Sequence, residues 1–186
     1  MYDFLALLGL SVWFGLPAWI ANAAPVVFGG GRPIDGGRLF IDGKRLFGDG
    51  KTVRGFVSGV LMGTMTGTVE HMLAPYLKPL IESYVSFSAD MEQLLFMTIP
   101  VAASLSVGAL LGDLFGSFLK RRFGIVSGGP APLLDQIGFL IVALILSSVF
   151  IEPSPVYVQL LVLLTVLAHW ISNMGGYLLG IKKHPW

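Results

Sequence analysis

The sequence contains no cysteine, and charged residues make up only 12% of its 186 positions. The absence of cysteine excludes disulfides, thiol nucleophiles and thiolate metal ligands. Any bound metal ion would therefore be held by oxygen or imidazole ligands, and Mg²⁺ is the natural candidate. The scarcity of charge, beside 54% hydrophobic residues, excludes an ordinary soluble domain and indicates an integral membrane protein.

Long apolar runs divide the chain into about five segments, each long enough to span a bilayer. A spanning helix needs about 20 residues, and we expect spans at about 2–28, 53–73, 93–119, 132–151 and 156–181. The runs are continuous rather than alternating, which argues against a closed barrel. The predicted fold is therefore an all-α integral membrane bundle of about five transmembrane helices, with residues 1–186 forming one membrane-embedded catalytic domain.

Basic residues lie almost entirely on one side of this topology. Of the 12 Lys and Arg residues, all but Lys78 fall within or beside the loops at 29–52 and 120–131, or near the C-terminus. The positive-inside rule places both loops and the C-terminus in the cytosol and the N-terminus outside. We therefore expect a multi-pass protein of the cell membrane whose active site faces the cytosol.

Two stripes of small residues predict close helix packing. Every fourth residue is small in the second span, at Gly55, Gly59, Gly63 and Gly67, and in the third, at Ser104, Gly108, Gly112 and Gly116. Small residues let helix backbones approach closely in membranes. We expect the stripes to hold the second and third spans together, which would place Lys51 and Arg54 beside Asp113.

The third span carries the strongest indication of a site. Asp113, Ser117 and Lys120 are spaced so that they share one helix face. A carboxylate at membrane depth is costly and usually marks function; the structural alternative is an ion pair of Asp113 with Lys120 or Arg121 that locks the hairpin. Asp135 follows a turn rich in glycine and proline and would return to a similar depth. Two facing aspartates ringed by basic residues could hold one or two Mg²⁺ ions together with phosphate oxygens.

The loop at 29–52 is rich in glycine and basic residues, a composition that suits a polyphosphate. Its GDGKT run, Gly48 to Thr52, is similar to part of a P-loop, but Arg45 stands where that pattern needs its first glycine, and no strand precedes the loop. Three aspartates beside glycines are expected to form turns rather than bind metal: Asp35, Asp42 and Asp49. A purely topological role for the charges of this loop stays open. Asn22, near the cytosolic end of the first span, could donate to a nucleotide or phosphate, or to another helix.

The motifs of the chain resemble those of a known enzyme family. The run GDLFGSFLKRRFG, with Asp135 heading the next span, is similar to the C-terminal signature of CDP-diacylglycerol synthases. The segments ANAAPVVFGGGRPIDGG and GDGKTVRG resemble more particularly the archaeal CDP-archaeol synthases, and the likeness covers nearly the whole chain. It implies transfer of the cytidylyl group of CTP to a prenyl-ether lipid phosphate, 2,3-bis-O-geranylgeranylglycerol 1-phosphate, with release of diphosphate.

The resemblance also implies residue roles. By motif position it assigns metal binding to Asp113 and Asp135, and phosphate contact to Ser117, Lys120 and Arg121, so that Asp113, Lys120 and Asp135 form the expected catalytic set. Further substrate contacts are expected from Asn22, Lys51, Thr52, Arg54 and Arg122. The chain departs from the bacterial-type signature, because VSGG replaces a Lys-Asp pair and Gln136 replaces an arginine. Lys51 or Arg54 would then supply the missing cation.

Such a reaction needs no protein nucleophile, since a phosphate monoester is largely dianionic at neutral pH and can itself attack the α-phosphorus of CTP. Positioning and charge neutralisation suffice. The expected partners are CTP, the lipid phosphate and the bilayer, without nucleic acid, and a homodimer stays open. The alternatives are a lipid-phosphate phosphatase, which usually needs a nucleophile such as histidine, a CDP-alcohol phosphotransferase, which carries more aspartates, and a small transporter, which would leave the basic loop unexplained.

Overall fold

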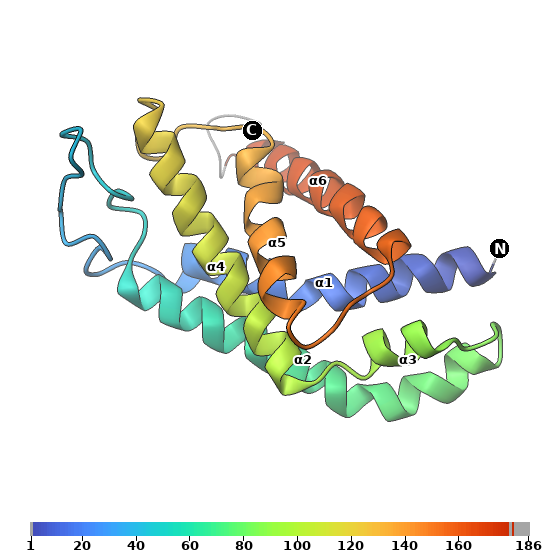
Figure 1. Ribbon diagram of the computed structural model, residues 1–186. Helices are drawn as coiled ribbons and strands as arrows, with labels where there is room; N and C mark the ends of the chain where they lie inside the picture. Colours follow the sequence, from blue (N-terminus) through green and yellow to red (C-terminus); the bar gives the residue numbers. More distant parts are fainter. Residues whose placement is uncertain (1, 179, 181–186) are drawn as a thin grey trace.

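The computed structural model describes residues 2–178 and 180, and the regular structure in this part of the chain is helical apart from two isolated β-bridges. The helices are α1 (Tyr2–Phe28), α2 (Val53–Glu82), α3 (Ala89–Leu95), α4 (Ile99–Arg122), α5 (Leu134–Ser147) and α6 (Pro155–Leu178). Figure 1 shows α4 and α5 side by side, and the long α1–α2 loop beside the end of α4. The predicted all-α class is confirmed.

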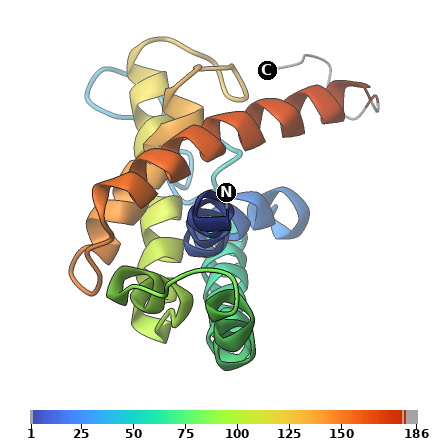
Figure 2. The same cartoon turned by 90° about the vertical axis from the view of Figure 1, so that its right-hand side faces the viewer.

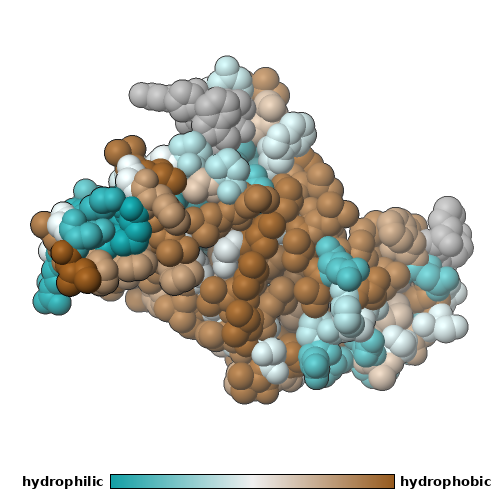
Figure 3. Space-filling view, turned by 45° about the horizontal axis from the view of Figure 1, so that its top comes forward, coloured by the Kyte–Doolittle hydropathy of each residue, from teal (hydrophilic) through white to brown (hydrophobic). Residues whose placement is uncertain are grey.

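Within the described residues, three helices are long and apolar enough to cross a membrane, namely α1 over Asp3–Phe28, α4 over Ile99–Arg122 and α6 over Pro155–Gly175. The apolar α5 has only 14 residues. The glycines, threonines and charged residues of α2 leave it outside this group despite its 30 residues. Figure 3 shows a broad hydrophobic band between two more polar ends, as expected for a membrane protein. The topology of about five membrane-spanning helices therefore stays a prediction.

The structure differs from the expected spans between α2 and α4. The second span, expected at 53–73, continues to the end of α2 although two prolines lie inside that helix. The span expected at 93–119 is divided into α3 and α4. Ser88 caps α3 by accepting a hydrogen bond from the N–H of Met91, and Pro100 lies in the first turn of α4, where its missing N–H costs little. Because the apolar pattern continues through this break, hydropathy alone does not reveal it.

The other observed helix boundaries also differ from those of the expected spans. α5 is shorter at both ends than the span expected at 132–151, whereas α6 follows the span expected at 156–181 as far as the described residues reach. The basic cluster expected in the loop at 120–131 lies instead on the last turn of α4. Cations are favoured there because the last carbonyl groups of a helix carry partial negative charge. The C-terminal residues Lys182 and Lys183, used above to orient the chain, lie outside the described residues.

The glycine stripes position the helices that carry the site. A Cβ atom at Gly63 of α2 would clash with Pro17 O of α1 and Ser106 Oγ of α4. The predicted packing of the second span against the third is therefore confirmed, and α1 joins it. A Cβ atom at Gly112 of α4 would lie 2.6 Å from Phe139 Cα of α5. The stripe on α4 thus receives α5 rather than α2, which differs from the expectation.

Tight apolar packing also surrounds α3, at the end of the bundle away from the α1–α2 loop (Figure 1). Leu94 and Leu95 of α3 and the following Met97 are each 1% exposed. Trp13 Nε1 of α1 donates a hydrogen bond to Leu95 O at 3.1 Å. In Figure 2, α6 crosses the outside of the bundle obliquely, and most of its apolar surface stays uncovered.

Candidate active site

The loop at residues 29–52, called the strap below, is folded around the carboxylate of Asp35. This buried side chain accepts hydrogen bonds from the N–H groups of Gly37, Phe47 and Gly48 and from the Arg45 guanidinium, at 2.8 to 3.3 Å. Burial by itself would raise the pKa of Asp35, but these hydrogen bonds hold the pKa well below its usual range. An ionised carboxylate ringed by donors therefore gives the strap its shape without an apolar core.

The end of the strap brings Lys51 to α4. Lys51 Nζ lies 2.5 Å from Asp113 Oδ2, which confirms the predicted proximity of these two residues. The alternative pairing of Asp113 with a cation of its own helix is not what the structure shows. The neighbouring Thr52 is buried and caps α2, its Oγ1 accepting a hydrogen bond from the N–H of Gly55. Together with Pro25 of α1, these residues line a small pocket.

The second predicted metal ligand, Asp135, lies in the first turn of α5. Its carboxylate accepts hydrogen bonds from Lys120 Nζ at 2.7 Å and from the N–H of Ala131 at 2.9 Å. An acidic residue is also favoured at a helix N-terminus, where unpaired N–H groups carry partial positive charge. Asp113 and Asp135 are therefore each neutralised by a lysine from a different segment of the chain.

A second pocket lies between the strap and the α4–α5 turn. Its lining includes Lys44, Arg45, Gly48, Arg121, Gly124 and Ser127. Arg121 is 8% exposed, and its Nε has no hydrogen-bond partner within the described residues. A buried N–H without a partner is costly, so an anion bound in this pocket would satisfy it. The phosphate contact expected of Arg121 stays a prediction.

Arg122 is engaged with the strap. The Cζ atom of its guanidinium lies 4.9 Å from the ring centroid of Phe40 in the strap and 4.7 Å from that of Phe118 on α4. Its Nη2 donates to Arg45 O at 2.5 Å, and its Nη1 lies 3.1 Å from Asp42 Oδ1 without hydrogen-bond geometry. Its Nε and Nη1 have no hydrogen-bond partner among the described residues, and the substrate contact expected of Arg122 stays a prediction.

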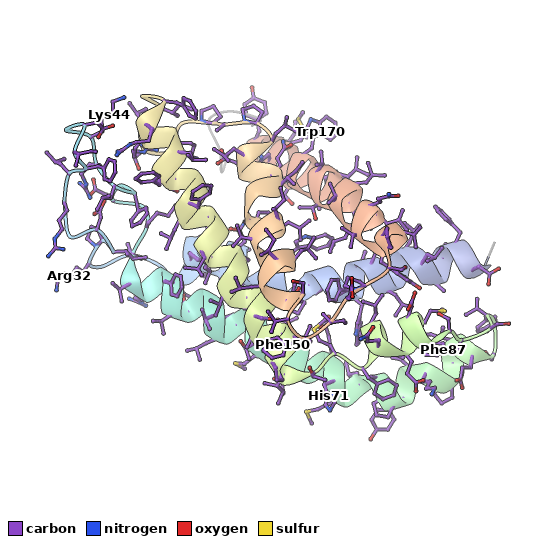
Figure 4. All side chains as sticks on the ribbon, in the orientation of Figure 1. Arg32, Lys44, His71, Phe87, Phe150 and Trp170 are labelled. Atoms are coloured by element: carbon purple, nitrogen blue, oxygen red, sulfur yellow. The ribbon has the colours of Figure 1, made fainter. Side chains whose placement is uncertain are left out.

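Three predicted substrate residues lie apart from these contacts. Arg54 is exposed in the first turn of α2, and Asn22 is half-buried on α1; neither side chain has a polar partner in the part of the chain that the structure describes. Ser117 is buried on α4, between Asp113 and Lys120 in sequence. Figure 4 shows that basic residues of the strap also diverge, because Arg32 points away from the bundle while Lys44 lies beside the end of α4.

Sequence reasoning missed Asp35 as the centre of the strap and the two aromatic partners of Arg122. The glycines beside the three strap aspartates indicate turns, but no local signal shows which aspartate becomes buried. Phe40 and Phe118 meet at 5.2 Å between ring centroids although they are far apart in the chain. A single sequence carries no sign of such a contact.

The donor set fits a magnesium ion that also binds substrate. Among the described residues, no group of three or more histidine, aspartate or glutamate side chains gathers at one place. The protein would therefore supply one or two carboxylates, with phosphate oxygens and water completing the coordination, which is the usual arrangement for Mg²⁺ in phosphate-handling enzymes. The two carboxylates predicted for this role, Asp113 and Asp135, each pair with a lysine ammonium group.

The fold and the site define a helical membrane protein whose polar end carries two lysine-paired carboxylates and a basic strap, an arrangement that suits phosphate chemistry. The comparison with protein families makes this specific, because the model described as CarS-like, CDP-archaeol synthase, matches residues 3–186. The chain therefore belongs to the CDP-archaeol synthase family.

Curated relatives agree with this membership. The chain is 43% identical over 176 residues to the CDP-archaeol synthase of Thermococcus kodakarensis, covering 95% of both chains. It is 42% identical over 184 residues to that of Methanocaldococcus jannaschii, covering 98% of this chain and 99% of the relative. A solved structure, described as an intramembrane enzyme for archaeal membrane lipids biosynthesis, superposes with a TM-score of 0.71 at 38% identity, covering 88% of this chain and 92% of the other.

Proposed function

We propose that the protein transfers the cytidylyl group of CTP to 2,3-bis-O-geranylgeranylglycerol 1-phosphate, giving CDP-archaeol and diphosphate. The observation that carries this proposal is the pairing of Asp113 with Lys51 and of Asp135 with Lys120, in a chain of the CDP-archaeol synthase family. The lysine ammonium groups beside the two carboxylates can be displaced by a metal ion. Two such carboxylates next to a basic, glycine-rich strap therefore suit the complex of a metal ion with a triphosphate.

Asp113 and Asp135 would hold Mg²⁺. When bound, the ion supplies charge neutralisation at the phosphate oxygens. The ammonium groups of Lys51 and Lys120 would then be released from the carboxylates and would donate to phosphate oxygens as charge-assisted hydrogen bonds.

The other site residues divide between the two substrates. Phosphate oxygens are contacted by three residues near the end of α4: the hydroxyl group of Ser117 and the cationic groups of Lys120 and Arg121. Lys51 and Arg54 supply positive charge to the triphosphate. Asn22 and Thr52 contact the nucleotide; the Thr52 hydroxyl can still donate, because it caps α2 as an acceptor.

The reaction is a single in-line displacement. An oxygen of the lipid phosphate forms a bond to the α-phosphorus of CTP, the bond from this phosphorus to the β-phosphate oxygen breaks, and diphosphate leaves with the electron pair. The dianionic lipid phosphate needs no protein base. What the side chains must supply is alignment and positive charge fixed in place before the reaction, which costs no reorganisation in the transition state.

The proposed arrangement in the membrane has five spans, with the N-terminus outside and both the strap and the C-terminus in the cytosol. CTP then arrives from the cytosol, while the two C20 chains of the lipid stay in the bilayer. The protein lies in the cell membrane, and no nucleic acid takes part. The homodimer stays a prediction.

The test is diphosphate release by purified protein in detergent with CTP, Mg²⁺ and a geranylgeranyl ether lipid phosphate. We expect release that requires the lipid and that falls at least about 100-fold in Asp113→Asn and Asp135→Asn, because each variant loses a carboxylate that positions the ion. Glu82→Asn, at the other end of α2, is the matched control and keeps activity.

No release by folded protein, whatever the lipid phosphate and linkage, would overturn the proposal. Phosphate release from the lipid without CTP would point to a phosphatase. Consumption of a CDP-activated lipid would point to a CDP-alcohol phosphotransferase, and ion flux through vesicles would point to a transporter.

A further inference from the structure

Arg122 holds the strap to α4 through several contacts at once. Its guanidinium lies 4.9 and 4.7 Å from the ring centroids of Phe40 and Phe118, and its Nη2 donates to Arg45 O. In addition, Lys44 Nζ donates to Arg122 O at 2.9 Å. A side chain of α4 therefore contacts the strap, and a side chain of the strap contacts the last turn of α4.

The strap touches the same helix a second time, through Lys51 and Asp113. The two attachment points on α4 are separated by roughly 14 Å along its axis, at about 1.5 Å per residue. Between them the strap supplies walls to both pockets, with Gly48 lining one and Gly50 the other. Its position therefore sets the shape of both pockets.

We propose that Arg122 is a positioning residue, a latch that holds the strap against α4 so that Lys51 and the glycines of the strap lie ready for CTP. This inference rests on the proposed function, because it gives the strap a role in binding the nucleotide. Under this proposal Arg122 does not make the substrate contact that the sequence led us to expect, but acts on substrate binding through the strap.

The geometry favours a latch over a phosphate ligand. The Arg122 guanidinium lies against the rings of Phe40 and Phe118, whose centroids are themselves 5.2 Å apart, and its Nη2 donates to a backbone carbonyl of the strap. A guanidinium within about 6 Å of an aromatic ring centroid is attracted to the ring. Lysine cannot replace it fully, since an ammonium group lacks the flat shape and the forked donors. A phosphate ligand would need neither Phe40 nor the carbonyl of Arg45.

Loss of the latch should weaken CTP binding more than it slows the chemistry. If the strap is correctly placed in only about a tenth of molecules, the apparent affinity falls about tenfold, because binding must first select that fraction. Once CTP is bound, the strap is in place and the reacting groups are unchanged. We therefore expect KM for CTP to rise about tenfold in Arg122→Ala, with kcat reduced less than about threefold.

The experiment combines kinetics with a distance measurement. Steady-state diphosphate release is measured for Arg122→Ala, Arg122→Lys, Phe40→Leu and the control Arg38→Ala, which removes an exposed strap cation whose side chain has no polar partner among the described residues. Because the chain has no cysteine, spin labels can be placed at Ile41→Cys in the strap and Val57→Cys on α2, both exposed. Their distance distribution is measured with and without CTP and Mg²⁺.

A latch predicts that Arg122→Ala and Phe40→Leu both raise KM and broaden the distance distribution, and that the double variant adds little. Arg122→Lys should recover part of both effects, and CTP with Mg²⁺ should narrow the distribution again. Arg38→Ala should match the parent protein.

The latch is overturned if Arg122→Ala lowers kcat about 100-fold with an unchanged distance distribution while Phe40→Leu behaves as the parent, since Arg122 would then act directly on substrate. It is also overturned if the distribution is unchanged in both variants. Absence of diphosphate release by the parent protein would instead contradict the proposed function, and the distance measurement without nucleotide would still decide whether Arg122 holds the strap.

Discussion

The two ends of the helical bundle are stabilised by different means. Around α3, Leu94, Leu95 and Met97 are almost completely buried. In the strap, Ile41 is 94% exposed, and the backbone is held by hydrogen bonds to Asp35. Apolar packing fixes a shape without needing ligands, whereas ion pairs and hydrogen bonds can exchange partners when a charged substrate arrives. The difference indicates a rigid end that supports the bundle and a polar end that can rearrange.

Each end of the bundle also has a lysine in an ion pair, and the two ion pairs have nearly the same length. Lys51 lies 2.5 Å from Asp113, and Lys78 lies 2.6 Å from Glu92. Lys78 also lies over the ring of Phe87, near the other end of the molecule. Distance alone therefore does not distinguish a functional pair from a structural one, and their positions in the fold suggest the difference.

The largest expected effect concerns the packed end. Leu95→Ala leaves a cavity among side chains that cannot close it, so we expect the free energy of unfolding to fall by about 3 kcal/mol. Denaturation by SDS in mixed micelles measures this loss. Ile41→Ala is the control and should change stability by less than about 0.5 kcal/mol. Equal effects of the two variants would remove the distinction between the two ends.

A second test compares the two lysines. Lys51→Ala should lower kcat/KM for CTP about 100-fold, because it removes a cation from the proposed triphosphate site. Lys78→Ala should leave kcat/KM within about twofold and cost less than about 1 kcal/mol of stability, as expected for a pair near the surface. Kinetics and unfolding are measured on both variants. Similar kinetic losses would show that Lys51 has no special role in the site.

A third test uses the depressed pKa of Asp35. A carboxylate whose pKa is lowered by folding stabilises the folded strap fully above its ordinary value of 3.8, and this stabilisation is lost as the pH falls below that value. Asp35→Asn should therefore loosen the strap at pH 7, and the difference from the parent should shrink below about pH 4. The mobility of a spin label at Ile41→Cys reports the strap. A difference that stays constant from pH 7 to pH 3 would exclude the ionised carboxylate as its cause.

The smallest expected effect is a gain of stability. Glu70 of α2 is 3% exposed, and neither carboxylate oxygen has a hydrogen-bond partner within the described residues. Burying such a group is costly, so Glu70→Gln should raise the free energy of unfolding by about 1 kcal/mol. The exposed Glu82→Gln is the matched control and should be neutral. A loss of stability in Glu70→Gln would indicate that the carboxylate has a partner in the membrane.

Several local features could be predicted because their causes are local. Continuous apolar runs predicted α1 and α6 closely, and the glycines of α2 predicted its packing against α4. That packing in turn predicted the proximity of Lys51 and Asp113. The break between α3 and α4 was not predictable from hydropathy, since buried apolar residues continue on both sides of it.

The sequence by itself determined the class of the protein and the chemistry available to it. Apolar runs require helices in a membrane, the lack of cysteine restricts metal ligands to oxygen and nitrogen, and nearly all positive charge lies in a few segments. Only the tertiary structure decided that Lys51 rather than Arg54 or a cation of α4 pairs with Asp113, that Asp135 meets Lys120, and that Asp35 is buried. The physical reason is that several lysines and arginines could pair with each carboxylate, and helix packing selects which of them come within reach.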